Sequence, residues 1–173
     1  MKRLLLVVDF QNDFVNGALG FDGASKLDDI ISKKIDNYLK NCDNIIFTLD
    51  THYNNYLETQ EGKRLPIIHC VKGTKGHNVY GKTGEYVNKA LKVFEKNTFG
   101  SLELGNFLKD KNYREIEIAG LVTNMCVISN AIIAKSALPE ARIIVDKNAS
   151  KSFDEDLHNK TIDVLEGLQV DII

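Results

Sequence analysis

Short apolar segments rich in branched side chains recur along this chain and end at polar residues. The first, residues 4–8 (LLLVV), contains no polar side chain and stops at Asp9. An unbroken apolar run of this length is typical of a strand buried on both faces, as strands of parallel sheets are. The pattern predicts further strands at 44–49, 115–121, 142–145 and 169–173, with a weaker candidate at 90–94.

Segments with helical periodicity separate most of these predicted strands. Residues 25–39 carry apolar side chains at three- and four-residue spacing, which indicates a helix with one buried face. Residues 125–137 are small and apolar on most sides, and 156–168 show a less regular apolar repeat. Alternating strands and helices predict right-handed crossovers and a doubly wound α/β sheet with helices on both faces.

One stretch, residues 51–84, departs from this alternation. It contains five of the 12 glycines, one of the two prolines and three of the four histidines, with little periodicity. A loop region of this length inside a compact domain is usually functional. Because no linker leads to a second hydrophobic segment, the sequence predicts a single domain over residues 1–173.

Charge and cysteine content exclude several classes of protein. The 173 residues include 22 Lys and Arg against 24 Asp and Glu, a net charge of −2, with no block of like charge. This balance argues against nucleic acid and against an anionic membrane as partners. Three cysteines cannot all pair, and the first apolar run, broken by Asp9, is too short for a signal peptide. We therefore expect free thiols in a reducing cytoplasm.

Chemically useful side chains follow several of the predicted strands. Ligands of an open α/β sheet bind at the carboxyl ends of its strands, where this chain has Asp9, Asp50, Lys96 and Cys126. Cys126 lies where a strand gives way to a helix, and the partial positive charge of a helix start lowers the pKa of a thiol. The backbone amides of such a turn suit an oxyanion hole. A purely structural cysteine among Val, Met and Ile is the alternative.

A second group of candidates lies at the start of the 51–84 loop and within it. Asp50 and His52 are two residues apart, so on an extended segment they project to the same side. His69, with Glu58 or Glu61 and water, would complete a small metal site. Imidazole and carboxylate ligands suit zinc, manganese or iron. The alternative is that these loop histidines are only surface residues.

Four separated segments match the sequence pattern of one enzyme family, in the family's order. They are VVDFQNDF at 7–14, LDTH at 49–52 with LPIIHCVKGTKG at 65–76, VFEKNTFGS at 93–101, and AGLVTNMCV at 119–127. Together they resemble the isochorismatase-like cysteine hydrolases, and within them the nicotinamidase branch. The resemblance implies a Rossmann-like layout of about six mainly parallel strands.

The resemblance also implies a cysteine-dependent amidohydrolase with Asp9, Lys96 and Cys126 as its catalytic triad. In the family mechanism the aspartate takes the thiol proton and the thiolate attacks the amide carbonyl. Ammonia then leaves, and water hydrolyses the thioester. The backbone N–H groups of Cys126 and Val122 would form the oxyanion hole, with a cis peptide bond preceding Val122.

A divalent metal ion is the cofactor that the resemblance implies. Nicotinamidases bind one with an Asp-x-His pair and a later His, which Asp50, His52 and His69 match. We assign Glu61 as the fourth ligand because it lies closer to His69 in sequence than Glu58 does. Zinc is the expected ion, with manganese or iron as alternatives. In this branch the metal binds the ring nitrogen of the substrate and so positions the ring.

The implied substrate is a small uncharged amide, and its implied contacts are Phe14 and Leu121. In the family a second aromatic residue, commonly Trp or Phe, stands three residues before the later metal-binding histidine. Here that position, relative to His69, is Pro66, preceded by Leu65. Without an aromatic side chain at position 66, one face of the substrate ring loses stacking worth on the order of 1 kcal/mol.

We interpret the chain as a nicotinamidase, which converts nicotinamide and water to nicotinate and ammonia. A related hydrolase that acts on another small amide or on isochorismate is the alternative among enzymes. A catalytically inactive binding module with the same fold is the alternative outside them. Because relatives are often oligomeric and the apolar helix at 125–137 offers an interface, we also expect a homo-oligomer.

Overall fold

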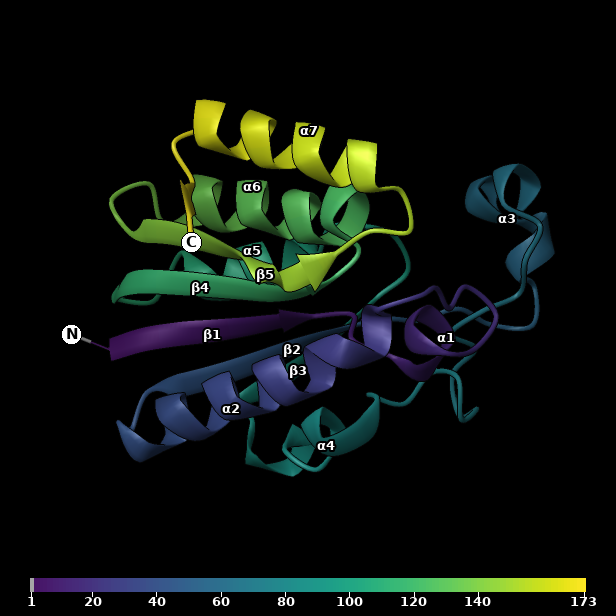
Figure 1. Cartoon of the computed structure of the whole chain (residues 1–173), viewed down its shortest axis with the longest axis horizontal. Helices are drawn as coiled ribbons and strands as arrows, with labels where there is room; N and C mark the ends of the chain where they lie inside the picture. The colour runs from purple at the N-terminus through teal and green to yellow at the C-terminus, as the bar shows by residue number, and fades with distance from the viewer. Residues whose placement is uncertain (1) are drawn as a thin grey trace.

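A parallel sheet forms the centre of the fold in the computed structural model, which describes residues 2–173 (Figure 1). Its six strands are β1 (Lys2–Val8), β2 (Asn44–Asp50), β3 (Lys92–Lys96), β4 (Tyr113–Leu121), β5 (Arg142–Lys151) and β6 (Asp171–Ile172). They lie in the order β3-β2-β1-β4-β5-β6, and all neighbouring pairs are parallel. This order confirms the predicted doubly wound, Rossmann-like α/β fold.

Helices cover both faces of the sheet (Figure 1). One face is covered by α2 (Leu27–Lys40), with α4 (Gly81–Gly84) beside it. The other is covered by α5 (Leu102–Leu108), α6 (Ile128–Ala137) and α7 (Glu155–Gly167). The connections from β1 to β2 and from β2 to β3 run over one face of the sheet, and those from β3 through β4 and β5 to β6 run over the other. Right-handed crossovers require this arrangement. Among the helices of residues 2–173, none has both the length and the apolar content that crossing a membrane requires.

The two faces carry separate apolar layers because successive residues of a strand point to opposite sides. In β1, Leu4, Leu6 and Val8 belong to the layer under α5 and α6, whereas Leu5 and Val7 belong to the layer under α2. All five side chains are fully buried, as the apolar run predicted. Each contributes roughly 1.5–3 kcal/mol relative to an exposed side chain, so β1 is central to both layers.

Short and irregular elements are what the sequence pattern missed. The helices α1 (Asn12–Val15), α3 (Gln60–Arg64), α4 and α5 span only four to seven residues, too few to show an apolar period. The strand β5 runs to Lys151 instead of ending at Val145. The added residues are mostly polar and therefore lack the apolar signal. The weak candidate at 90–94 is a strand, β3, displaced by two residues.

Gly120 is required where β4 passes the end of β1. It pairs with Val8 and has a φ of +127°. A Cβ at this position would lie 2.0 Å from the carbonyl oxygen of Val8. The close approach places the carboxyl ends of β1 and β4 side by side. This is the point where the strand order reverses, and α/β folds of this type bind ligands there.

We expect Gly120→Ala to lower the free energy of unfolding by at least about 3 kcal/mol, because the methyl group collides with backbone and the φ is unfavourable for alanine. Urea unfolding followed by circular dichroism measures the change. Gly167→Ala is the matched control, since a Cβ there meets no atom of residues 2–173 within 4 Å. Equal stability of the two variants would contradict the prediction.

Candidate active site

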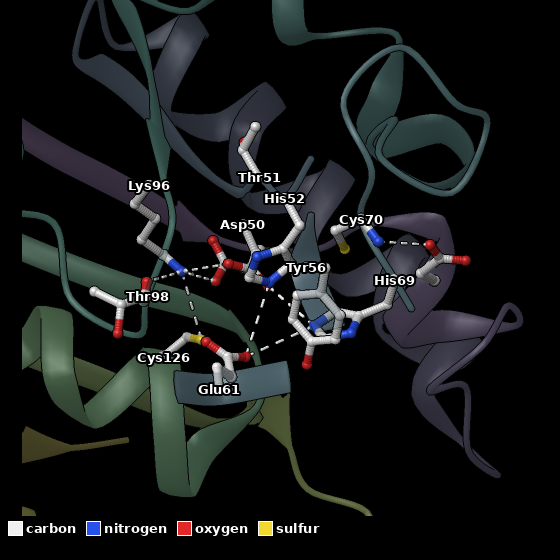
Figure 2. Close-up of polar contacts among 12 residues, drawn as sticks. Asp50, Thr51, His52, Tyr56, Glu61, His69, Cys70, Lys96, Thr98 and Cys126 are labelled. Atoms are coloured by element: carbon white, nitrogen blue, oxygen red, sulfur yellow. Dashed lines mark hydrogen bonds and ion pairs between the residues drawn. The ribbon is translucent and has the colours of Figure 1, made fainter. Parts of the chain in front are cut away.

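Three ionisable side chains meet at the carboxyl end of the sheet. Asp9 follows β1, Lys96 is the last residue of β3, and Cys126 lies in η4 (Thr123–Val127), a π-helical turn that leads into α6. The Nζ atom of Lys96 lies 2.5 Å from Asp9 Oδ2 and 3.6 Å from Cys126 Sγ. Figure 2 shows Lys96 pointing toward Cys126. The fold thus gathers residues that lie far apart in the sequence.

These three side chains are almost entirely removed from water. Asp9 is fully buried, and Lys96 and Cys126 are 6% and 5% exposed. A buried charge without a partner costs several kcal/mol, so each member of the Asp9–Lys96 pair requires the other. Asp9 Oδ1 also accepts a hydrogen bond from the Thr48 hydroxyl at 2.7 Å, and Lys96 donates one to the Thr98 carbonyl at 2.9 Å. These bonds hold the pair in one arrangement.

Burial and mutual charge shift the pKa values of all three groups. Burial raises the pKa of the Cys126 thiol well above its ordinary value, and the charge of Asp9 raises it further. The expectation that the helix start lowers this pKa is therefore wrong for the free protein. Burial also raises the pKa of Asp9, which makes it a stronger base. Burial alone lowers the pKa of Lys96, but the charges of Asp9 and Cys126 outweigh it, so Lys96 stays protonated.

The turn between β4 and α6 places the nucleophile next to open space. The peptide bond between Leu121 and Val122 is cis, as the family resemblance implied. Val122 and Cys126 both line a cavity at the end of the sheet. Leu121 does not line it, because this last residue of β4 is fully buried in the apolar layer under α2. The expected contact between Leu121 and the substrate is therefore wrong.

A second group of ionisable side chains lies beside the first (Figure 2). It consists of Asp50, His52, Glu61 and His69, and one ligand atom from each lies within 4.8 Å of the others. Asp50 Oδ2 lies 3.0 Å from His52 Nε2 and 3.3 Å from His69 Nε2. Glu61 Oε1 lies 3.8 and 3.9 Å from the same two nitrogens. Glu58, the alternative fourth ligand, is not one of the four.

The chemistry of this group fits a divalent metal ion. The Nδ1 atom of His69 donates a hydrogen bond to the Ile67 carbonyl at 2.7 Å, so Nε2 is the ring nitrogen that faces the group and is available to a metal ion. Burial raises the pKa of Glu61, and the charge of Asp50 raises it further. Two carboxylates in a confined space favour a cation between them. Two imidazoles and two carboxylates are ligands that zinc, manganese and iron accept.

Gln11 holds the end of β2 in place, although its neutral side chain offered no chemical signal in the sequence. It is fully buried. Its Nε2 donates hydrogen bonds to the carbonyls of Asp50 at 2.9 Å and His77 at 2.8 Å. Its Oε1 accepts a hydrogen bond from the backbone N–H of Asp50 at 2.8 Å. The backbone of one candidate ligand is therefore clamped from both sides.

Two further contacts fix the irregular loop that carries His69. Asp13 of α1 accepts a hydrogen bond from the backbone N–H of Cys70 at 2.7 Å. The ring of Tyr56 packs against both imidazoles, with its centroid 4.5 Å from that of His52 and 5.0 Å from that of His69. The candidate ligands are thus held by side chains from distant segments, because the loop has little regular structure of its own.

A cavity of about 850 Å³ connects the two groups. Its lining includes Cys126 from the first group and Asp50, Glu61 and His69 from the second. Phe14 also lines it, with its ring centroid 5.6 Å from that of His69. A small molecule in this cavity is in reach of a thiol and of a metal-binding group at the same time.

Gln11→Leu should lower the free energy of unfolding by at least about 2 kcal/mol, because it leaves three buried backbone groups without partners. We also expect metal affinity to fall about tenfold as the backbone of Asp50 loses its support. Urea unfolding and competition with a chelating dye measure the two effects. Asn106→Leu is the control, since Asn106 is exposed on α5 and does not line the cavity. An unchanged metal affinity in Gln11→Leu would show that the clamp does not position Asp50.

Comparison with known proteins places the chain in a family. Residues 3–173 match the family model of the Isochorismatase domain. The chain is 28% identical over 169 residues to the isochorismatase family protein PncA of Bacillus subtilis, covering 91% of each chain. It is also similar to the crystal structure of a nicotinamidase/pyrazinamidase from Bacillus subtilis, with a TM-score of 0.88, 26% identity and 99% of each chain covered. A Pyrococcus horikoshii pyrazinamidase solved in complex with zinc shares the fold, with a TM-score of 0.86, 21% identity, and 100% of this chain and 99% of that one covered. The chain therefore belongs to the isochorismatase domain family.

Proposed function

We propose that this protein is a nicotinamidase, which hydrolyses nicotinamide to nicotinate and ammonia through a thioester on Cys126. The observation that carries the proposal is the single cavity lined by Cys126 and by Asp50, Glu61 and His69. A buried thiol beside a base suits many hydrolases. The adjacent metal-binding group adds a place for a pyridine nitrogen. The similarity to a solved nicotinamidase/pyrazinamidase supports the same function.

Asp9 is the base in this proposal. Its Oδ2 is ion-paired with Lys96 at 2.5 Å, and a carboxylate oxygen can accept a second hydrogen bond. It therefore has a lone pair for the thiol proton of Cys126. The sulfur then forms a bond to the carboxamide carbon, and the carbonyl electron pair moves to oxygen. When the C–N bond breaks, Asp9 returns the proton to the nitrogen and ammonia leaves.

The charge that develops during the reaction needs nearby donors. The backbone N–H groups of Val122 and Cys126 would stabilise the oxyanion, since both residues line the cavity where the amide binds. Lys96, 3.6 Å from Cys126 Sγ, would stabilise the thiolate before it attacks. Water then hydrolyses the thioester, with Asp9 as the base again, and releases nicotinate.

Asp50, His52, Glu61 and His69 would hold a zinc ion. When bound, the ion supplies a Lewis acid that fixes the ring nitrogen and so sets the distance between the carboxamide and the thiol. The zinc complex of the Pyrococcus horikoshii pyrazinamidase supports zinc over other ions. Phe14 would contact the ring from the side of His69, the imidazole nearest to it in the cavity.

Four further properties stay predictions from the sequence. The match of residues 3–173 to one family model supports a single domain. The near-neutral charge supports a small uncharged substrate, which needs no electrostatic steering. We also expect a homo-oligomer with the apolar helix at 125–137 in its interface, and a cytoplasmic location, which suits the free cysteines.

Cys126→Ala should abolish ammonia release from nicotinamide, because the nucleophile is gone. Asp9→Asn should lower kcat by about 10²–10⁴-fold, the usual contribution of a general base. A coupled assay for ammonia measures both. Cys42→Ala is the matched control, since this free cysteine is exposed. Full activity in Cys126→Ala would show that another group is the nucleophile.

Removal of metal tests the second group of residues. We expect about one zinc ion per chain by elemental analysis, and its loss in His52→Ala. Chelation should abolish hydrolysis of nicotinamide, and zinc should restore it. Benzamide lacks the ring nitrogen, so any slow hydrolysis of benzamide should be insensitive to chelation. His158→Ala, outside the group, should keep its zinc. Equal chelator sensitivity for the two amides would count against a role in binding the ring.

A further inference from the structure

The cavity extends well beyond the residues that the proposed reaction uses. Its volume of about 850 Å³ lies near the upper end of the roughly 300–1,000 Å³ found for sites of drug-sized ligands. A one-ring amide such as nicotinamide is far smaller than a drug-sized ligand. Much of the cavity therefore remains free when such an amide lies against Cys126.

Burial distinguishes the floor of this cavity from its mouth. At the floor, Cys126, Asp50 and His69 are 5%, 4% and 2% exposed. Phe99 and Phe153, which line the same cavity, are 42% and 59% exposed. The polar, reactive groups are thus at the buried end of the cavity, and these aromatic side chains line its more exposed part.

Three phenylalanines from separate segments form this aromatic rim. Phe21 follows α1, Phe99 follows β3, and Phe153 lies between β5 and α7. The rings of Phe21 and Phe153 meet edge to face, with centroids 6.3 Å apart. Partly exposed aromatic side chains that line a cavity are typical of a ligand-binding surface. None of the three takes part in the proposed reaction.

The shape of nicotinamide determines which of its atoms faces this rim. Its carboxamide is on C3 and its nitrogen is N1, so C2 lies between the two groups and C5 lies opposite C2. When the carboxamide faces Cys126 and the nitrogen faces the Asp50 and His69 group, both polar ends are at the floor. The C5 edge of the ring then points to the mouth.

We infer that the preferred substrates of this protein are nicotinamides that carry a flat apolar group at C5, which the aromatic rim binds. This inference rests on the proposed function and adds the substrate class. Pro66 leaves one face of the pyridine ring without an aromatic neighbour from that position. A substituent at C5 would contact Phe21, Phe99 and Phe153. These contacts replace the stacking that an aromatic side chain at position 66 would give.

Kinetics with nicotinamide, 5-phenylnicotinamide and 2-phenylnicotinamide test this inference. We expect KM for the 5-phenyl amide to be about tenfold below that for nicotinamide, because its added ring is partly buried against aromatic side chains. The 2-phenyl amide should not be hydrolysed, since C2 faces the floor. A KM for the 5-phenyl amide equal to or above that of nicotinamide would overturn the inference.

Variants locate the effect at the rim. In Phe153→Ala the preference for 5-phenylnicotinamide, as the ratio of the two kcat/KM values, should fall about fivefold. Val164→Ala is the matched control, because this residue is 51% exposed on α7 and does not line the cavity. Its ratio should equal that of the wild type. Equal ratios in Phe153→Ala and Val164→Ala would overturn the assignment of the rim.

Calorimetry gives a second readout that does not depend on turnover. Zinc-loaded Cys126→Ala should bind 5-phenylnicotinamide about tenfold more tightly than nicotinamide. Hydrolysis of nicotinamide together with weaker binding of the 5-phenyl amide would overturn this inference and leave the proposed function standing. Failure to hydrolyse either amide would overturn the proposed function, and the substrate class with it.

Discussion

The buried ion pair between Asp9 and Lys96 is the interaction on which the whole site depends. Both charges are almost entirely removed from water, so each is tolerated only beside the other. Lys96 also lies 3.8 Å from Asp50 Oδ1, because Asp50 and Lys96 pair directly in the ladder between β2 and β3. Burial alone would raise the pKa of Asp50, but its hydrogen bonds with both imidazoles and the charge of Lys96 hold that pKa well below its usual range. One lysine therefore couples the nucleophile to the metal-binding group.

The parallel sheet explains how these charges come together. The carboxyl ends of β1, β2, β3 and β4 all lie at one edge of the sheet, and the strand order reverses between β1 and β4. Gly120 lets the ends of those two strands approach closely, and Gln11 joins the end of β1 to the end of β2. The reactive groups consequently open onto a single cavity, and the aromatic side chains of three separate segments surround its mouth.

The nucleophile turn is also held from the opposite side, by residues that do not touch the cavity. The hydroxyl of Thr123 is hydrogen-bonded to His158 of α7 at 2.8 Å. Ser152 donates a hydrogen bond to Asn124 at 2.7 Å. Asn130 of α6 donates one to the Cys126 carbonyl at 2.8 Å. This second set of contacts fixes the π-helical turn from the side of α6 and α7, so the thiol stays beside its base.

The sequence by itself determined the strands, the fold class and most of the candidate groups. Apolar runs and helical spacing are local patterns, and parallel strands bring their ends together, so Asp9, Lys96 and Cys126 were candidates by position. The resemblance to the isochorismatase-like hydrolases is what implied that they form a catalytic triad. Only the tertiary structure showed the roles of Gln11 and Thr48, whose partners lie 39 or more residues away in the sequence. It also decided that Leu121 faces the core and that the pKa of Cys126 is raised. The burial of a side chain and the charges around it depend on residues from distant segments. A local sequence pattern does not contain that information.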